Sequence, residues 1–199
     1  INSDENAIVG EVIYDNQGRP AIEILPVPTE NDKIKYYDNF NLRQGADHAF
    51  THHDFDWDDP GASVCQTSVV TMDPSIGASK YYSPNNASDP ERPYQDFVAD
   101  AQGFPFSQIQ YTPDNTGRIR SKGGVGPDHQ LGSGHEMKYF YSTPTQSELN
   151  RLFGYRVGNA AHYKKNMVVD PNGQVSVSYI DPQGRTIATA LTADSPKLE

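Results

Sequence analysis

The chain has 199 residues, a formal net charge of −10 and a sequence isoelectric point near 4.9. This acidic balance argues against a nucleic-acid partner, because binding to phosphates needs clustered lysine and arginine side chains. Only 35% of the residues are hydrophobic, and glycine, proline and tyrosine are frequent, with 16, 15 and 12 residues. Such a composition favours a turn-rich, all-β protein over a helical bundle.

The cysteine content, the hydrophobic runs and the chain ends further narrow the class of protein. Cys65 is the one cysteine, so an intrachain disulfide is impossible, and we interpret it as a small buried hydrophobe. No apolar run is long enough to cross a bilayer, so we predict no membrane insertion by this segment. Residues 198–199, Leu-Glu, are typical of an expression-vector scar. We therefore expect an excised piece of a longer protein.

The first predicted element is a β-hairpin over residues 7–25, with apolar residues on both arms and a turn that starts at Asp15. We expect Pro26 and Pro28 to end the second arm, because proline cannot donate a hydrogen bond to an inner ladder. Residues 1–30 therefore form a predicted N-terminal hairpin unit.

Residues 31–93 are predicted to be an insertion. Within it we expect a short strand near 34–37, a polar, acidic and histidine-bearing loop over 43–61, and a strand over 63–72. The stretch 83–93 is rich in proline, asparagine and serine and is predicted to be a loop.

The acidic loop offers a candidate metal site at Asp54, Asp56 and Asp58. On an extended segment these carboxylates share one face and repel each other, and either bound Ca²⁺ or open exposure to water would relieve the repulsion. The EF-hand pattern fails, since its sixth and twelfth positions lack the glycine and glutamate. Zn²⁺ is the weaker alternative, because His48 and His52 would suit it only on a helix.

Aromatic residues supply candidate ligand-binding positions, since aromatic faces stack on sugars. Tyr81 and Tyr82 are adjacent, and Trp57 stands in the acidic loop. On a strand, adjacent side chains point to opposite faces, so one member of such a pair would belong to the core. The alternatives are a carbohydrate or partner patch and ordinary packing.

Residues 94–195 are predicted to be mainly β, with strands over 136–142 and within 162–191. One short helix is expected at 145–153. Thr145 and Glu148 make a capping box, and an apolar stripe follows at helical spacing.

The glycine-rich stretch 123–134 lacks the Lys-Ser/Thr ending of a phosphate-binding loop. Nor does Ser133 stand in a nucleophile elbow, which needs glycine two residues before and two residues after the serine, where this chain has Leu131 and His135. We interpret the stretch as a tightly packed loop. The alternative is a catalytic or metal group formed by His129, His135 and Glu136.

One phrase, Asp-x-x-Gly, occurs six times, and three copies are followed at once by arginine. The aspartate can accept hydrogen bonds from backbone N–H groups of a turn, and the glycine can take the positive φ that closes a short hairpin loop. We therefore predict related β-hairpins. Outside the acidic loop, the phrases start at Asp15, Asp100, Asp114, Asp170 and Asp181.

Residues 14–19, Tyr-Asp-Asn-Gln-Gly-Arg, resemble the core of the YD repeat of Rhs-family proteins, and residues 179–188 are a close variant. The stretch 111–191 resembles the region that leads into the repeat array of large surface or secreted Rhs-type proteins of the Bacteroidetes. The spacing of the phrases is irregular, which indicates a repeat-bearing segment with insertions.

This resemblance implies antiparallel hairpins that join a sheet or shell, and a non-enzymatic structural or binding role in a protein that is secreted or lies on the outer cell surface. The implied partners are the rest of the parent protein and a carbohydrate or a protein. The expected cofactor is none, or Ca²⁺. The alternatives are a self-standing carbohydrate-binding module and, ranked last, a hydrolase or nuclease fragment with a His/Asp metal site.

Overall fold

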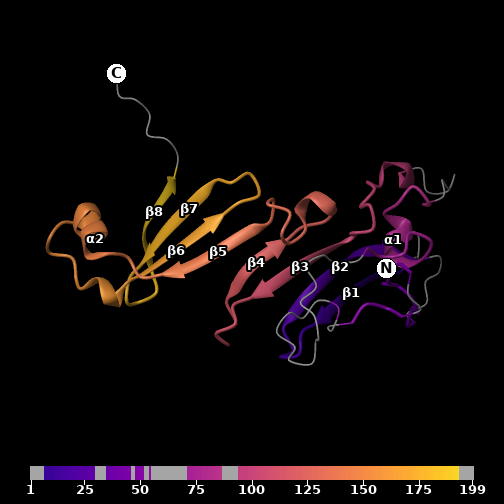
Figure 1. The fold of residues 1–199 in the computed structure, drawn as a ribbon, viewed down its shortest axis with the longest axis horizontal. Coiled ribbons are helices and arrows are strands. Elements are labelled where there is room, and N and C mark those ends of the chain that lie inside the picture. The colour runs from indigo at the N-terminus through magenta and orange to yellow at the C-terminus, as the bar shows by residue number, and fades with distance from the viewer. Residues whose placement is uncertain are drawn as a thin grey trace, which may run out of the picture.

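A computed structural model describes residues 7–29, 35–45, 48–51, 54, 71–86 and 94–192. Its eight strands form one antiparallel sheet in which every strand lies beside its sequence neighbours, in the order β1 to β8 (Figure 1). The predicted all-β fold with a short helix near 145–153 is confirmed. The strands are β1 Ile8–Tyr14, β2 Pro20–Pro28, β3 Phe106–Tyr111, β4 Ile119–Gly123, β5 Met137–Ser142, β6 Lys164–Val169, β7 Val175–Ile180 and β8 Thr186–Thr192.

The strand order fixes the positions of the connections. Because neighbouring strands are antiparallel, the connections β1–β2, β3–β4, β5–β6 and β7–β8 lie at one end of the strands. Helix α2 (Gln146–Phe153) and the 3₁₀ turn η4 (Ala160–His162) replace a tight turn between β5 and β6. At the other end, α1 (Gly77–Tyr81) and η2 (Gln95–Phe97) belong to the β2–β3 connection, and η3 (Pro127–His129) to β4–β5.

Two hydrophobic clusters lie at opposite ends of this elongated sheet (Figure 1). In the first, Ile22 and Ile24 of β2 pack with Phe106 of β3 and with residues of the β2–β3 connection, and all three are nearly or fully buried. In the second, Leu149 of α2 packs against Val177 of β7 and its neighbours. The middle strands β4 and β5 join the two clusters by a short ladder.

The expectation that Pro26 already ends the first hairpin is wrong, because β2 continues to Pro28, where it pairs with Ile8 of β1 and ends. The ladder between β2 and β3 covers only Ile22–Ile24. Both prolines therefore lie where β2 has an adjacent strand on one side only, and no second ladder needs their missing N–H group.

The insertion differs from the sequence prediction in two places. Residues 35–37 are not in a strand, so that part of the predicted strand is wrong, while residue 34 and most of 63–72 lie outside the described residues. The short helix α1 was not predicted, since five residues carry no periodic signal. Gly77 enables α1 to start there: its φ is 62°, and a Cβ would come within 2.2 Å of the Phe40 carbonyl oxygen.

The structure confirms the predicted position of helix α2 and the capping box that begins it. The Thr145 side chain accepts from the Glu148 N–H at 3.2 Å, and Glu148 Oε2 accepts from the Thr145 N–H at 2.7 Å. Only Leu149 of the apolar stripe is fully buried, whereas Leu152 and Phe153 remain 48% and 39% exposed. Among the described residues, no helix is long and apolar enough to cross a membrane.

Candidate functional site

The Asp-x-x-Gly-Arg hairpins at Asp15 and Asp181 have the same geometry. In each, Oδ1 accepts the N–H groups of the residues two and four positions later at 2.8–2.9 Å. The other carboxylate oxygen binds the guanidinium: Arg19 Nε lies 2.6 Å and Arg185 Nε 2.8 Å from its Oδ2. In each hairpin, one carboxylate therefore accepts the hydrogen bonds of the turn and also positions the arginine that directly precedes the next strand.

The other phrases are variants of this turn. Asp170 makes the same two backbone contacts at 2.9 Å, but Gln174 stands in the place of arginine. In the β3–β4 hairpin Thr112 closes the loop by donating its N–H to the Arg118 carbonyl at 2.8 Å, so Asp114 lies two residues further into a longer turn. The phrase at Asp100 forms a turn that leads into β3, and the prediction of a hairpin there is wrong.

Two of these arginines contact a tyrosine of the next strand. The Arg19 guanidinium carbon lies 4.2 Å from the Tyr111 ring centroid, and Tyr111 Oη donates to the Pro20 carbonyl at 2.9 Å. We call this arrangement, an aspartate-bound arginine under a tyrosine whose hydroxyl binds the next carbonyl, the tyrosine clasp. Burial and the charge of Asp15 raise the pKa of Tyr111 although Arg19 lowers it, so the hydroxyl remains a proton donor at neutral pH.

The clasp repeats between β4 and β5. The Arg118 guanidinium carbon lies 4.8 Å from the Tyr141 ring centroid, and Tyr141 Oη donates to the Ile119 carbonyl at 2.9 Å. Arg118 is in turn held by Asp114, whose pKa is lowered by hydrogen bonds from Thr112, Thr116 and Arg118. Each clasp therefore ties the second strand of one hairpin to the first strand of the next.

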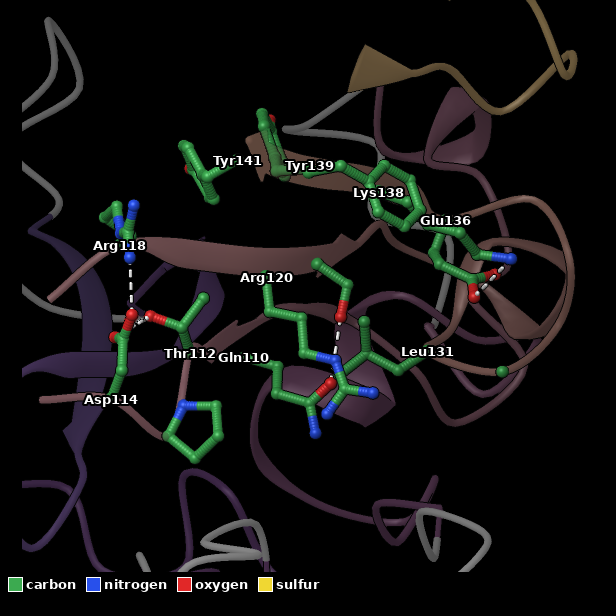
Figure 2. A pocket seen from close by; sticks show the side chains of 14 residues that line it. Gln110, Thr112, Asp114, Arg118, Arg120, Leu131, Glu136, Lys138, Tyr139 and Tyr141 are labelled. Atoms are coloured by element: carbon green, nitrogen blue, oxygen red, sulfur yellow. Dashed lines mark hydrogen bonds and ion pairs between the residues drawn. The ribbon is translucent and has the colours of Figure 1, made fainter. Parts of the chain in front are cut away.

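A groove of about 730 Å³ lies beside the second clasp, over β3, β4 and β5. Beside it, β4 and β5 are joined by the two ladder pairs Ser121↔Lys138 and Lys122↔Met137. Figure 2 shows Asp114 and Arg118 at one end of the groove, Glu136 and Lys138 at the other, and Arg120 between them. Tyr139 and Tyr141 line the wall that β5 contributes.

The groove carries one guanidinium without a counter-ion. Arg118 is paired with Asp114 at 2.5 Å, and Lys138 with Glu136 at 3.3 Å. The side chain of Arg120 is exposed and makes no hydrogen bond or ion pair with the described residues. The groove therefore combines a local positive charge with aromatic walls on a chain whose net charge is −10.

The predicted metal site lies largely outside the described residues, which exclude Asp56, Asp58 and also Trp57. Asp54 Oδ2 accepts from the Thr51 N–H at 2.8 Å, and Arg43 Nη1 donates to Asp54 Oδ1 at 3.1 Å. Within the described part of the chain, no three His, Cys, Asp or Glu side chains form a group that could hold a metal ion. The Ca²⁺ site remains a prediction.

The remaining candidate residues belong to neither tyrosine clasp. Tyr81 and Tyr82 contact each other edge to face with ring centroids 5.0 Å apart, and Tyr82 Oη donates to the Pro26 carbonyl at 2.7 Å. The rings of His129 and His135 lie 6.2 Å apart. Their neighbour Glu136 accepts the Gly134 N–H at 2.8 Å as well as binding Lys138.

Sequence reasoning did not place Tyr141 and Arg120 at one site. The signal available for Tyr141 was an aromatic run in the strand after an Asp-x-x-Gly-Arg hairpin, but the register that puts one member of the run on the arginine is a long-range property. A scan of protein-family models, a search of curated proteins and a search of solved structures each found no match.

Proposed function

We propose that this chain is a non-enzymatic structural segment of a YD-repeat, Rhs-like protein that is secreted or lies on the outer cell surface. The observation that carries the proposal is the tyrosine clasp, which occurs at both the β2–β3 and β4–β5 junctions. In this role the hairpins are building units, and the phrase Asp-x-x-Gly-Arg with a following tyrosine is the device that joins them. The main partner is the rest of the parent protein.

The energetics of hairpins support a joining role. An isolated two-stranded hairpin is at best marginally stable in water, so each unit needs its neighbours. A cation–π contact contributes about 0.5–1 kcal/mol at exposed sites, and a hydrogen bond about 1 kcal/mol. Each clasp therefore adds about 1.5–2 kcal/mol by these estimates to a junction with few ladder hydrogen bonds.

Replacing the clasp tyrosines by phenylalanine tests the proposal. Tyr111→Phe and Tyr141→Phe keep the ring and remove the hydroxyl that reaches the neighbouring strand. We expect each change to lower the free energy of urea unfolding by about 1 kcal/mol. Tyr155→Phe, whose side chain is 91% exposed, is the matched control and should have no effect. Equal stability of all three variants would contradict a joining role for the clasp.

A second candidate, carbohydrate contact, is favoured by the groove beside Tyr139 and Tyr141. Aromatic walls can stack on sugar rings, and the unpaired Arg120 can bind a carboxylate through two parallel hydrogen bonds. Uronic-acid oligosaccharides should therefore bind more tightly than neutral ones in calorimetric titrations. Arg120→Ala should remove that preference, whereas Arg156→Ala, at another exposed arginine, should leave it unchanged. No binding to either class of sugar would exclude this candidate.

A further inference from the structure

The two outer strands of the sheet carry the two halves of a clasp. Among the described residues, β8 pairs only with β7 and β1 pairs only with β2. Next to β8, Arg185 is fixed by Asp181 as Arg19 is by Asp15, yet its side chain is 74% exposed. At the end of β1, Tyr14 is 52% exposed.

Tyr14 and Tyr111 occupy equivalent positions in their hairpins. Each stands directly before the residue that donates its N–H to the arginine carbonyl and so closes the turn. Each is also paired with the residue that follows the arginine, Pro20 for Tyr14 and Ile119 for Tyr111. Tyr111 binds the arginine of the preceding hairpin, whereas no hairpin precedes Tyr14 in the described chain.

The two existing clasps share one register. The β2–β3 ladder pairs Ile22 with Gln108, and extending it places Tyr111 directly opposite Arg19. The β4–β5 ladder pairs Ser121 with Lys138, and the same extension places Tyr141 directly opposite Arg118. A strand that binds β8 by the same rule therefore places a tyrosine opposite Arg185.

We propose that β1 of a second copy of this chain binds along β8, with Tyr14 of the second copy in a clasp on Arg185. The strand directions agree: β8 is the second strand of its hairpin and β1 the first, as β2 and β3 are. The ring of Tyr14 covers the guanidinium, and its hydroxyl donates to the Thr186 carbonyl. This contact goes beyond the proposed function, which concerns joints within one chain.

The two edges also match in their apolar side chains. The clasp register places Val12 opposite Ile187 and Ile8 opposite Leu191. Ile8, Val12 and Leu191 are 55%, 40% and 66% exposed in the single chain. All seven residues of β8 are uncharged, and the strand contains no proline. A long edge without charges or proline is open to pairing with another strand.

The geometry makes the association head to tail. β1 and β8 lie at opposite ends of the elongated sheet (Figure 1), so one copy can bind a partner at each end. Such a heterologous contact produces open rows of copies when it does not close into a ring. A symmetric pair would need like edges to meet, which would leave the Tyr14 and Arg185 halves unmatched.

Sedimentation velocity on the wild type and on Tyr14→Ala and Arg185→Ala tests the proposal. The wild type should form dimers and longer species as its concentration rises. Each variant alone should bind its own kind at least about tenfold more weakly, which corresponds to about 1.4 kcal/mol. Tyr155→Ala and Arg156→Ala, at exposed positions in the β5–β6 connection, should associate like the wild type.

An equimolar mixture of the two variants gives the sharpest readout. Tyr14→Ala retains Arg185, and Arg185→Ala retains Tyr14, so one intact clasp can form between unlike copies. The mixture should therefore form dimers with wild-type affinity, while longer rows stay weak. A wild type that remains monomeric at high concentration, or a mixture that behaves as the two separate variants do, would overturn the proposal. Neither result would affect the clasps within one chain.

Discussion

The junctions between successive hairpins are built in two different ways. The β2–β3 and β4–β5 junctions have three and two registered ladder pairs, and both carry a tyrosine clasp. The β6–β7 junction has six registered pairs, a tight turn at Asp170 with Gln174 in the place of arginine, and no such clasp. Side chains thus reinforce the sheet where the backbone ladder is short, because fewer interstrand hydrogen bonds leave a weaker joint.

The two ends of the sheet also differ in the elements that supply their stabilising side chains. At the β5–β8 end the helix α2 covers the strands, and Lys165 Nζ binds Glu148 Oε1 at 2.5 Å. The Tyr179 hydroxyl donates to the same oxygen at 3.3 Å. A tyrosine, a cation and a carboxylate again meet, but the carboxylate comes from a helix. This end should therefore depend on the helix, and the β1–β4 end on its turns.

The largest expected effect is at Leu149, whose side chain is fully buried under α2. Leu149→Ala should lower the free energy of unfolding by about 3 kcal/mol, because it removes packed methyl groups and leaves a cavity. Urea unfolding followed by circular dichroism measures it. Leu152→Ala, at a side chain that is 48% exposed, should lose under about 1 kcal/mol. Equal losses in the two variants would mean that α2 does not pack as described.

The next largest effect concerns the turn at Asp15, which binds an arginine, in comparison with the turn at Asp170, which does not. Asp15→Ala removes two turn hydrogen bonds and releases Arg19 from its position under Tyr111. Asp170→Ala removes the same two turn hydrogen bonds and no ion pair. We expect losses of about 2 kcal/mol and about 1 kcal/mol in urea unfolding. A larger loss of unfolding free energy in Asp170→Ala than in Asp15→Ala would contradict the added contribution of Arg19 to the Asp15 turn.

A smaller effect should appear in acid. The hydrogen bond from Lys165 leads in lowering the pKa of Glu148 from 4.5 to about 2, and the carboxyl pKa of Asp114 is also lowered. Burial alone would raise the pKa of Asp181, but hydrogen bonds and the charge of Arg185 lower it overall. A carboxylate with a lowered pKa stabilises the fold fully above its unfolded pKa and loses that contribution as pH falls through the folded value.

Melting temperatures should therefore fall steadily as the pH is lowered from above 4.5 towards 2. Glu148→Gln keeps the helix cap and removes the charge, so the decline should become shallower. Glu23→Gln, at an exposed position on β2, should leave the decline unchanged. An acid decline that is identical in all three proteins would contradict the role assigned to the Glu148–Lys165 pair.

The last effect concerns the predicted Ca²⁺ site at Asp54, Asp56 and Asp58. A bound ion stabilises the folded state by about 1.4 kcal/mol at ten times its dissociation constant. The prediction is a higher melting temperature in Ca²⁺ than in EDTA, and loss of this difference in Asp56→Asn. Melting curves that do not differ between Ca²⁺ and EDTA would exclude the site.

The sequence predicted those features that a few neighbouring residues decide. The capping box at Thr145 and the Asp-x-x-Gly turns were found because their hydrogen bonds join residues two to four positions apart. The clasps were not found, since Tyr111 meets an arginine 92 positions away only once the order and register of the strands exist. The path of β2 through Pro26 was missed for the same reason, because proline is tolerated only where one flank has no ladder.

A double-mutant cycle measures directly whether Arg19 and Tyr111 hold adjacent hairpins together. The free energy of urea unfolding would be determined for the wild type, Arg19→Ala, Tyr111→Leu and the double variant. We expect a coupling energy of about 1 kcal/mol, while the pair Arg185→Ala and Tyr111→Leu, which do not touch, should be additive. Additive losses for Arg19 and Tyr111 would show that this contact does not hold the hairpins together.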